Sequence, residues 1–235
     1  MAFDPIERSF YVENVVMSGN KRKYYRFRHS LHYGGIVTAD AVGCNLLCAY
    51  CWNYGRNLHP ERFGEYHTPQ EVARRLTDIS RKVGYDLFRV SGAEPILGER
   101  SAQHLVEVMR LVGGPFILET NGLMFGYKPD LVDLFASLNV SVRVSVKGWD
   151  EESFEKVTGA KGEFFEYQLR ALEALHKRRI RFWVAVMDEV FKGKGLERLR
   201  RRLPVPCRIE REPMEKYPFV VENMKKRGLL KQGDS

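Results

Sequence analysis

The sequence has little cysteine and no long apolar run. Its 235 residues include only 4 Cys, too few for a small secreted fold held together by disulfides. No apolar run approaches the roughly 20 residues that cross a bilayer, and the first residues are acidic where a signal peptide needs a basic region. The 6 His form no recognisable triad with Ser or Cys, which argues against a hydrolase. We therefore expect a cytoplasmic protein without a membrane segment.

What the sequence does contain is enough apolar material for one compact domain. Hydrophobic residues make up 44% of the chain, and the 14 Phe and 11 Tyr bring large side chains to bury. This composition excludes a disordered chain. From residue 36 onwards, strand-like apolar runs alternate with amphipathic segments, with no internal repeat, and this alternation is typical of an α/β fold.

The alternation predicts six strands, at 36–42, 86–91, 116–120, 140–146, 180–187 and, more weakly, 205–209. Helices are expected at 69–83, around 105–112, along 131–138, from 151 and along 165–175. Each strand and helix unit takes about 29 residues, the length of a βα repeat. A complete eight-stranded barrel needs roughly 250 residues, so a partial (β/α)6 barrel fits better. A doubly wound open sheet is the alternative.

The most specific motif is a C-x3-C-x2-C triplet, formed by Cys44, Cys48 and Cys51 on the loop after the first strand. Thiolates this close together bind soft metals or iron–sulfur clusters. A four-iron cluster held by three thiolates leaves one iron open to a substrate or cofactor. The alternative is structural zinc completed by Cys207 or His59, but such sites are usually two pairs of ligands. We expect Cys207 to be a small buried residue of a strand.

The triplet resembles the signature of the radical S-adenosylmethionine (SAM) superfamily, which lies on the loop after the first barrel strand. A second match follows strand two, where residues 91–95 read Ser-Gly-Ala-Glu-Pro. This segment resembles the family's Gly-Gly-Glu-Pro, which binds the methionine amino group. Ala93 replaces the second glycine, and an alanine is accommodated there only if the position needs no positive φ.

Two further segments match in the expected order. After strand three, residues 119–122 read Glu-Thr-Asn-Gly, similar to a segment that lies beside the SAM carboxylate in glycyl-radical activating enzymes. On strand four, Ser145 and Lys147 fall where those activating enzymes have Asp-x-Lys, so Lys147 matches and Ser145 departs. Trp52 follows the last cysteine, at a position that is commonly aromatic in the family and lies near the adenine.

The resemblance implies an enzyme with two cofactors. Cys44, Cys48 and Cys51 would hold a [4Fe–4S] cluster, and SAM would be bound by Trp52, Gly92, Ala93, Glu94, Thr120, Asn121, Ser145 and Lys147. An electron from a flavodoxin or ferredoxin type of donor would enter the cluster and cleave SAM to methionine and a 5′-deoxyadenosyl radical. That radical would abstract hydrogen from the substrate, so no protein base is required and no catalytic side chain is assigned.

The resemblance also divides the chain. It covers about residues 36–190, the expected barrel core. Residues 1–35 form an N-terminal extension, and residues 191–235 form a basic C-terminal segment that completes the barrel edge. We expect a monomer.

The substrate is predicted to be a macromolecule, protein or RNA. A small barrel with one cluster and Glu-Thr-Asn-Gly after strand three most resembles the glycyl-radical activating enzymes of the pyruvate formate-lyase type, which act on a partner protein. The alternative, RNA modification, comes from the net charge of +8 and from basic runs at 21–28 and 192–202, the first interleaved with aromatic residues. A third interpretation is a nucleic-acid-binding protein with a structural metal and no catalysis.

Overall fold

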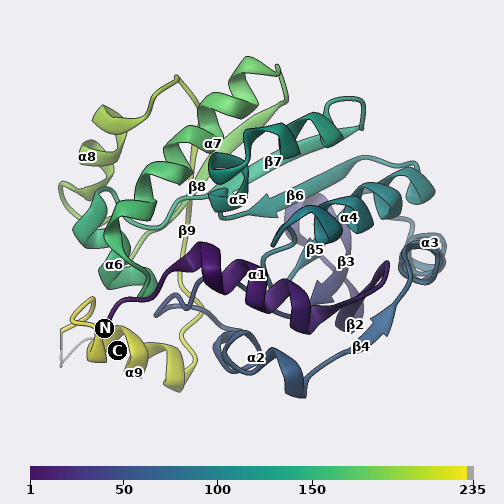
Figure 1. Cartoon of the computed structure of the whole chain (residues 1–235), viewed down its shortest axis with the longest axis horizontal. Coiled ribbons are helices and arrows are strands. Elements are labelled where there is room, and N and C mark those ends of the chain that lie inside the picture. The colour runs from purple at the N-terminus through teal and green to yellow at the C-terminus, as the bar shows by residue number, and fades with distance from the viewer. Residues whose placement is uncertain (232–235) are drawn as a thin grey trace.

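A computed structural model describes residues 1–231 as one mixed α/β fold (Figure 1). The strands are β1 (Met17–Ser18), β2 (Lys21–Ser30), β3 (Ile36–Ala41), β4 (Glu65–His67), β5 (Phe88–Ser91), β6 (Phe116–Thr120), β7 (Val140–Ser145), β8 (Phe182–Met187) and β9 (Ile209–Glu212). The helices are α1 (Pro5–Val16), α2 (Tyr54–Leu58), α3 (Pro69–Val83), α4 (Glu99–Val112), α5 (Leu123–Tyr127), α6 (Glu151–Thr158), α7 (Phe165–Lys177), α8 (Gly195–Arg202) and α9 (Pro218–Lys226). Short 3-10 turns lie at His32–Gly34, Pro60–Arg62, Pro129–Phe135 and Gly162–Phe164.

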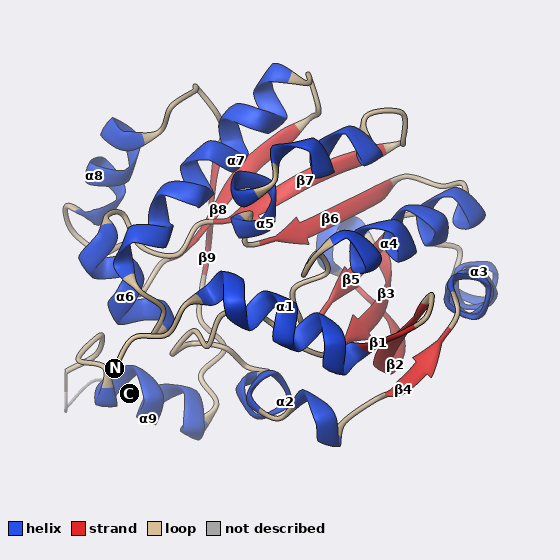
Figure 2. Cartoon of the chain, viewed as in Figure 1, coloured by secondary structure: helices blue, strands red, loops and turns tan. Residues whose placement is uncertain are grey.

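Six parallel strands form the body of the sheet, in the order β3-β5-β6-β7-β8-β9. This order confirms the predicted partial barrel, because each strand neighbours the next parallel strand along the chain. Figure 2 shows these strands with helices such as α4 and α7 outside them. The sheet extends further than predicted, since β2 pairs antiparallel with β3 and carries β1 and β4.

The strand sequences assign one face to the helices and the other to the barrel interior. Buried Val90, Leu118, Val142 and Val184 belong to the main apolar core, while the alternate positions on the same strands carry Arg89, Glu119, Arg143 and Trp183. Side chains alternate along a strand, so the charged residues share the inner face. Helix α3 closes one unit as predicted, with a capping box between Thr68 and Glu71 and a left-handed Gly84 at its end.

Two local predictions were wrong, and a third segment has more structure than was predicted. The sixth strand lies at Ile209–Glu212 instead of 205–209, and Pro206 within the predicted run has no N–H to donate to a sheet. The helix expected along 131–138 is a 3-10 segment after the separate helix α5. The first 35 residues, predicted only as an extension, form α1 and the ten-residue strand β2.

Within residues 1–231 no helix is long and apolar enough to cross a membrane.

Candidate active site

The cysteine loop begins where β3 ends, at the carboxyl end of the parallel strands. Distant side chains fix its backbone: Arg8 of α1 donates to the Cys44 carbonyl at 3.3 Å, and Arg227 after α9 donates to the Leu47 carbonyl at 2.8 Å. The Ala49 amide donates to the carbonyl of Val157 at the end of α6. The loop is thus held from elements at both ends of the described chain.

The three thiols of this loop are in a setting that suits a metal cluster. Burial raises the pKa of Cys44, Cys48 and Cys51, that of Cys51 to about 11, so each thiolate needs a metal to form at neutral pH. Asn57 Nδ2 donates to the Cys51 Sγ at 3.5 Å. In the described residues, no three His, Cys, Asp or Glu side chains converge closely enough to hold a single metal ion. The three cysteines of the loop are included in this finding, so it does not separate zinc from a cluster.

Cys207 does not belong to this group. It precedes β9 and lines a surface hollow together with Leu203, Pro204 and Ile209, at the amino end of the last parallel strand. The cysteine loop lies at the opposite, carboxyl end of the strands. Cys207 is half-buried in a loop, so its predicted position inside a strand was wrong.

The loop after β5 comes close to the backbone of the cysteine loop. Gly92 has φ 81°, and a Cβ there would lie 3.2 Å from the Ala41 carbonyl oxygen, so the turn requires glycine. Asn53, two residues after Cys51, donates to the Gly92 carbonyl at 2.5 Å. Ala93 has no positive φ, which explains how alanine is accommodated in place of the second glycine.

Glu94 connects this loop to the end of β6. Its carboxylate accepts hydrogen bonds from the Ile96 amide, the Thr120 hydroxyl at 2.7 Å and the Asn121 amide at 2.8 Å. Burial raises the Glu94 pKa to about 7, against these hydrogen bonds and the nearby Arg22. The Asn121 side chain continues the network by donating to the Asn45 Oδ1. Glu94, Thr120 and Asn121 are therefore brought together as predicted, but their side chains bond one another and the loops.

Lys147, which follows the end of β7, also lies beside the cysteine loop. Its Nζ is 5.1 Å from the centre of the Tyr50 ring. Burial opposes its charge, but Tyr50, Cys48 and Glu212 raise the Lys147 pKa overall. The buried Gln168 of α7 accepts from the Lys147 amide and donates to the Ser145 carbonyl, which fixes this strand end. Trp52 is half-buried.

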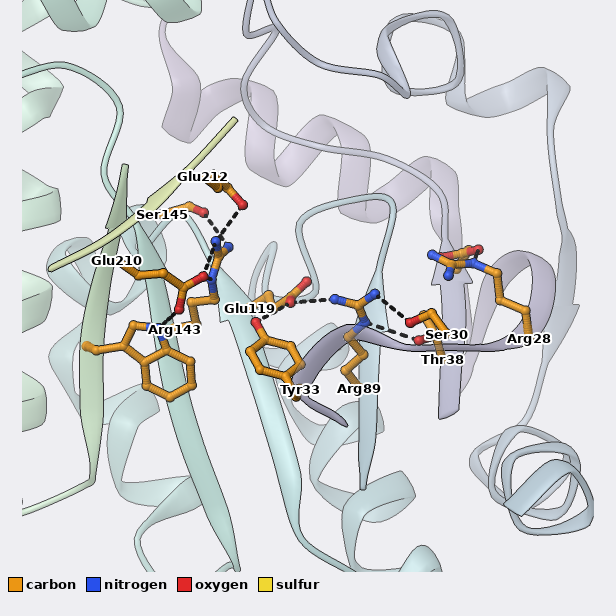
Figure 3. Close-up of polar contacts among 12 residues, drawn as sticks. Arg28, Ser30, Tyr33, Thr38, Arg89, Glu119, Arg143, Ser145, Glu210 and Glu212 are labelled. Carbon is orange, nitrogen blue, oxygen red and sulfur yellow. Dashed lines mark hydrogen bonds and ion pairs between the residues drawn. The ribbon is translucent and has the colours of Figure 1, made fainter. Parts of the chain in front are cut away.

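Below these loops, the inner face of the strands carries a row of ion pairs (Figure 3). Arg89 of β5 donates to the Glu119 carboxylate at 2.7 Å. Arg143 of β7 reaches past β8 to bind Glu210 at 3.0 Å and Glu212 at 2.5 Å, both on β9. A contact that skips a strand is possible on the concave side of a curved sheet. The two arginine side chains are 7% exposed, whereas their carboxylate partners are 17% to 34% exposed, so the arginines are shielded and the carboxylates are partly open to solvent.

Both edges of the sheet contribute to this charged face. Asp40 of β3 is fully buried and binds Arg26 at 2.6 Å and Arg28 at 2.7 Å, both on β2. Tyr33, from the loop between these strands, donates to Glu119 and packs edge-on against Trp183. Figure 3 shows Arg28 at one end of the row and Glu212 at the other.

Sequence reasoning missed the residues of this inner face. The available signal was a polar or charged residue at every second position of an apolar strand, as in Val-Ser-Val-Arg-Val-Ser at 140–145. In a packed barrel core those positions are apolar, so an arginine there indicates a polar interior.

Comparison with models of known protein families assigns the chain to a family. The family model described as "Radical SAM superfamily" matches residues 40–198, which include the cysteine loop and all strands from β5 to β8. The chain belongs to the radical SAM superfamily. The predicted family is confirmed, and the protein is an enzyme.

Curated proteins resemble the chain over part of its length. The GTP 3′,8-cyclase of Aquifex aeolicus is 30% identical over 156 residues, 64% of this chain and 45% of that protein. The 7-carboxy-7-deazaguanine synthase of Methanocaldococcus jannaschii is 25% identical over 161 residues, 63% of this chain and 62% of that protein. The chain spans 33% to 45% of the length of the first two cyclases that it matches.

Solved structures share the fold at low sequence identity. A radical SAM methyltransferase from Sphaerobacter thermophilus has a TM-score of 0.60 at 13% identity, covering 83% of this chain and 64% of that one. SuiB of Streptococcus suis, bound to S-adenosylmethionine, has a TM-score of 0.58 at 13% identity, covering 75% of this chain and 40% of that one.

The residues of this radical SAM enzyme fit the family's cofactors, a [4Fe–4S] cluster and SAM. Three thiols on one loop, with Cys48 buried and Cys44 and Cys51 half-buried, suit a cluster with one open iron. A Cβ at Gly92 would crowd the Ala41 carbonyl oxygen and the Tyr25 hydroxyl, so glycine keeps this loop close to the start of the cysteine loop.

Proposed function

We propose that this radical SAM enzyme removes a hydrogen atom from a small polar molecule bound against the charged inner face of the barrel. When bound, the cluster and SAM supply the 5′-deoxyadenosyl radical that takes the hydrogen. The cysteine loop would hold the cluster, and the backbone at residues 91–95 would hold the methionine end of SAM. We further propose that the protein acts as a monomer and receives electrons from a flavodoxin or ferredoxin type of donor.

The observation that carries this proposal is the charged row directly beneath the SAM-binding segments. Glu119 immediately precedes Thr120 and Asn121 on β6. At the other side, Lys147 of the predicted SAM site is within electrostatic range of Glu212. A molecule that contacts the charged row would therefore lie next to SAM, as hydrogen transfer requires.

The charges in the row are separated by sign, and the separation suggests the class of substrate. Asp40 is shared by Arg26 and Arg28, so the β2 side has one excess positive charge. Arg143 is shared by Glu210 and Glu212, so these three side chains on the β9 side carry one excess negative charge, with Lys147 within electrostatic range of Glu212. The complementary molecule has an anionic group toward β2 and cationic or N–H donor groups toward β9.

The named activities of the curated relatives agree with a small substrate. One relative is called a GTP 3′,8-cyclase and another a 7-carboxy-7-deazaguanine synthase. GTP has an anionic triphosphate at one end and a base with N–H donors at the other, and this chain's separated charges would suit a molecule of that general kind.

The macromolecular substrate expected from the sequence has less support. In the basic run at 21–28, Arg22 and Lys23 are buried, and Arg26 and Arg28 bind Asp40. In the run at 192–202, Arg202 pairs with Glu151 of α6. Much of the charge that suggested RNA binding is therefore used inside the fold.

An assay of SAM cleavage distinguishes the substrate classes. The protein is reconstituted anaerobically with iron and sulfide, reduced with dithionite and supplied with SAM, and 5′-deoxyadenosine is measured. A cell extract is separated by ultrafiltration into a small-molecule filtrate and a macromolecular retentate. We expect the filtrate to stimulate 5′-deoxyadenosine formation. Stimulation only by the retentate, abolished by protease or ribonuclease, would instead support the activating-enzyme or the RNA-modifying interpretation.

A further inference from the structure

The turn between β2 and β3 holds a tyrosine in an unusual backbone conformation. Tyr33 has φ 55° and ψ 24°, in the left-handed region that an aromatic residue rarely occupies. Gly34 and Gly35 follow with φ 81° and 128°, so the chain takes three consecutive positive φ values there. A glycine at position 33 would adopt this conformation without strain. The strain at Tyr33 therefore points to a use for its side chain.

The Tyr33 hydroxyl and Arg89 meet at one oxygen of a single carboxylate. The hydroxyl donates to Glu119 Oε1 at 2.9 Å, and Arg89 Nη1 donates to the same atom at 2.7 Å. Burial and the charge of Glu119 raise the Tyr33 pKa, so the hydroxyl stays protonated and donates. No group within residues 1–231 donates to Glu119 Oε2. Because the Glu119 side chain is 17% exposed, this second oxygen is open to an N–H group of a small molecule.

The Tyr33 ring lies across the amino end of the barrel interior. The turn directly precedes Ile36, where β3 begins, so Tyr33 enters from the amino end of the parallel strands. Its ring centre is 5.9 Å from the Arg89 guanidinium and 6.4 Å from the Trp183 ring centre. Figure 3 shows Tyr33 in the middle of the charged row. Since the cysteine loop is at the carboxyl end, a molecule between that loop and Tyr33 is bounded at both ends.

We infer that Tyr33 sets the depth and the hydrogen-bonding preference of the substrate site: its ring forms the floor, and its hydroxyl fixes Glu119 so that Oε2 accepts an N–H group of the substrate. Tyr33 is thus a positioning residue. The inference rests on the proposed function and deepens it, because it places one N–H donor of the small polar molecule at β6, between the parts of the molecule that face β2 and β9.

Two variants separate the hydroxyl of Tyr33 from its ring. Tyr33→Phe removes only the hydroxyl, whereas Tyr33→Gly removes the whole side chain and also relieves the backbone strain. Tyr66→Phe is the matched control. Tyr66 of β4 is similarly exposed, and its hydroxyl donates to the Val15 carbonyl, outside the charged row.

Substrate binding is tested in the SAM-cleavage assay with the small-molecule filtrate. Tyr33→Phe and Glu119→Gln should each raise the half-saturating filtrate concentration by about tenfold, because a hydrogen bond to a charged group is weakened or lost. The maximal rate at saturating filtrate and the SAM affinity measured by calorimetry should stay near those of the unmodified protein. An unchanged half-saturating concentration in Tyr33→Phe, or an equal rise in Tyr66→Phe, would overturn the hydrogen-bonding part.

The floor is tested without any substrate. When Trp52→Phe and Trp149→Phe are introduced together in the full chain, Trp183 is the remaining tryptophan of the three, and acrylamide quenching of its fluorescence measures its accessibility. We expect Tyr33→Gly to lose the protection of Trp183 from acrylamide, and Tyr33→Phe to keep it. Equal quenching with and without the Tyr33 ring would overturn the floor. If the filtrate stimulates neither the unmodified protein nor any variant, the proposed function fails, while the quenching result still decides the floor.

Discussion

The two halves of the site are held by different kinds of contact. At the loop end, uncharged and charged side chains bond backbone carbonyls, as Arg8 does with Cys44, Asn53 with Gly92, and Gln168 with Asn121 and Ser145. The side-chain bonds there, such as that of Thr120 with Glu94, add to these backbone contacts and are not ion pairs. On the inner face, side chains bond side chains, as Arg89 does with Glu119, Arg28 with Asp40, and Arg143 with Glu210 and Glu212.

This difference distinguishes the loop end, where the backbone is fixed, from the inner face, where ion pairs can exchange partners. A side chain that holds a carbonyl fixes the path of the chain, which suits cofactors bound in one geometry by every member of the family. An ion pair between two side chains can open and offer each charge to a ligand without moving the backbone. Substitutions at the loop end should therefore weaken cofactor binding, and substitutions on the inner face should weaken substrate binding.

The largest effect is expected from the cysteines of the loop end. Cys44→Ala, Cys48→Ala and Cys51→Ala should each abolish cluster binding, because two thiolates do not hold a four-iron cluster stably. Iron per chain and the visible absorption of the reconstituted protein measure the loss. Cys207→Ala is the control and should retain iron. Equal loss of iron from Cys207→Ala would mean that four thiolates close the cluster.

A smaller effect is expected from the network that joins the two loops. Glu94→Ala removes three hydrogen bonds, and we expect SAM affinity to fall by roughly ten- to a hundredfold, with iron content unchanged. Lys147→Ala should weaken SAM binding less, because its backbone stays fixed by Gln168. Calorimetry with SAM measures both. Unchanged SAM affinity in both variants would mean that the segments around Glu94 and Lys147 shape the backbone and do not bind SAM.

On the inner face, Glu212→Gln should leave iron and SAM affinity unchanged. The concentration of small-molecule filtrate needed for half-maximal SAM cleavage should rise by about tenfold, since a charged hydrogen-bond partner of the substrate is lost. Asp133→Asn is the matched control: it neutralises a carboxylate paired with Arg178, which is likewise shared by two carboxylates but lies outside the site. A loss of SAM affinity in Glu212→Gln would contradict the division into two halves.

The smallest expected effect is on the stability of the folded protein in acid, and we attribute it to His104. His104 of α4 contacts the Tyr24 hydroxyl and the Asn20 carbonyl, and burial lowers its pKa to about 4. Between pH 6.5 and 4 the unfolded chain binds a proton that the folded one does not, so stability falls as pH falls through this range. His104→Gln should reduce the loss of unfolding free energy between pH 6.5 and pH 4 by on the order of 1 kcal/mol. Urea unfolding of the apo-protein at several pH values measures this loss. An unchanged slope would place the acid sensitivity elsewhere.

Local sequence patterns were sufficient for the first five parallel strands and for the cysteine loop. The triplet of Cys44, Cys48 and Cys51 is contiguous, and α3 has both of its ends marked by Thr68 and Gly84. These features depend on neighbours in the chain, so they are visible without the fold.

Features that depend on distant contacts were not visible. Residues 21–28 interleave basic and aromatic side chains, and their charge suggested a surface for RNA. Only the fold shows that Arg22 faces Glu94, 72 positions away, and that Arg28 faces Asp40. Likewise, Glu94 carries a motif position, but its bonds to Thr120 and Asn121 required the third strand to be placed beside the second.

The contact between Arg227 and the cysteine loop has a consequence for the order of assembly. Its guanidinium bonds the carbonyls of Leu47 and Val157, the first of them 180 positions earlier in the chain. During synthesis, the cysteines leave the ribosome long before residue 227 does, and loops that close over such separations form slowly. The cysteine loop is then complete only when the barrel is already folded. Iron and sulfide are accordingly expected to enter a finished barrel and not to nucleate its folding.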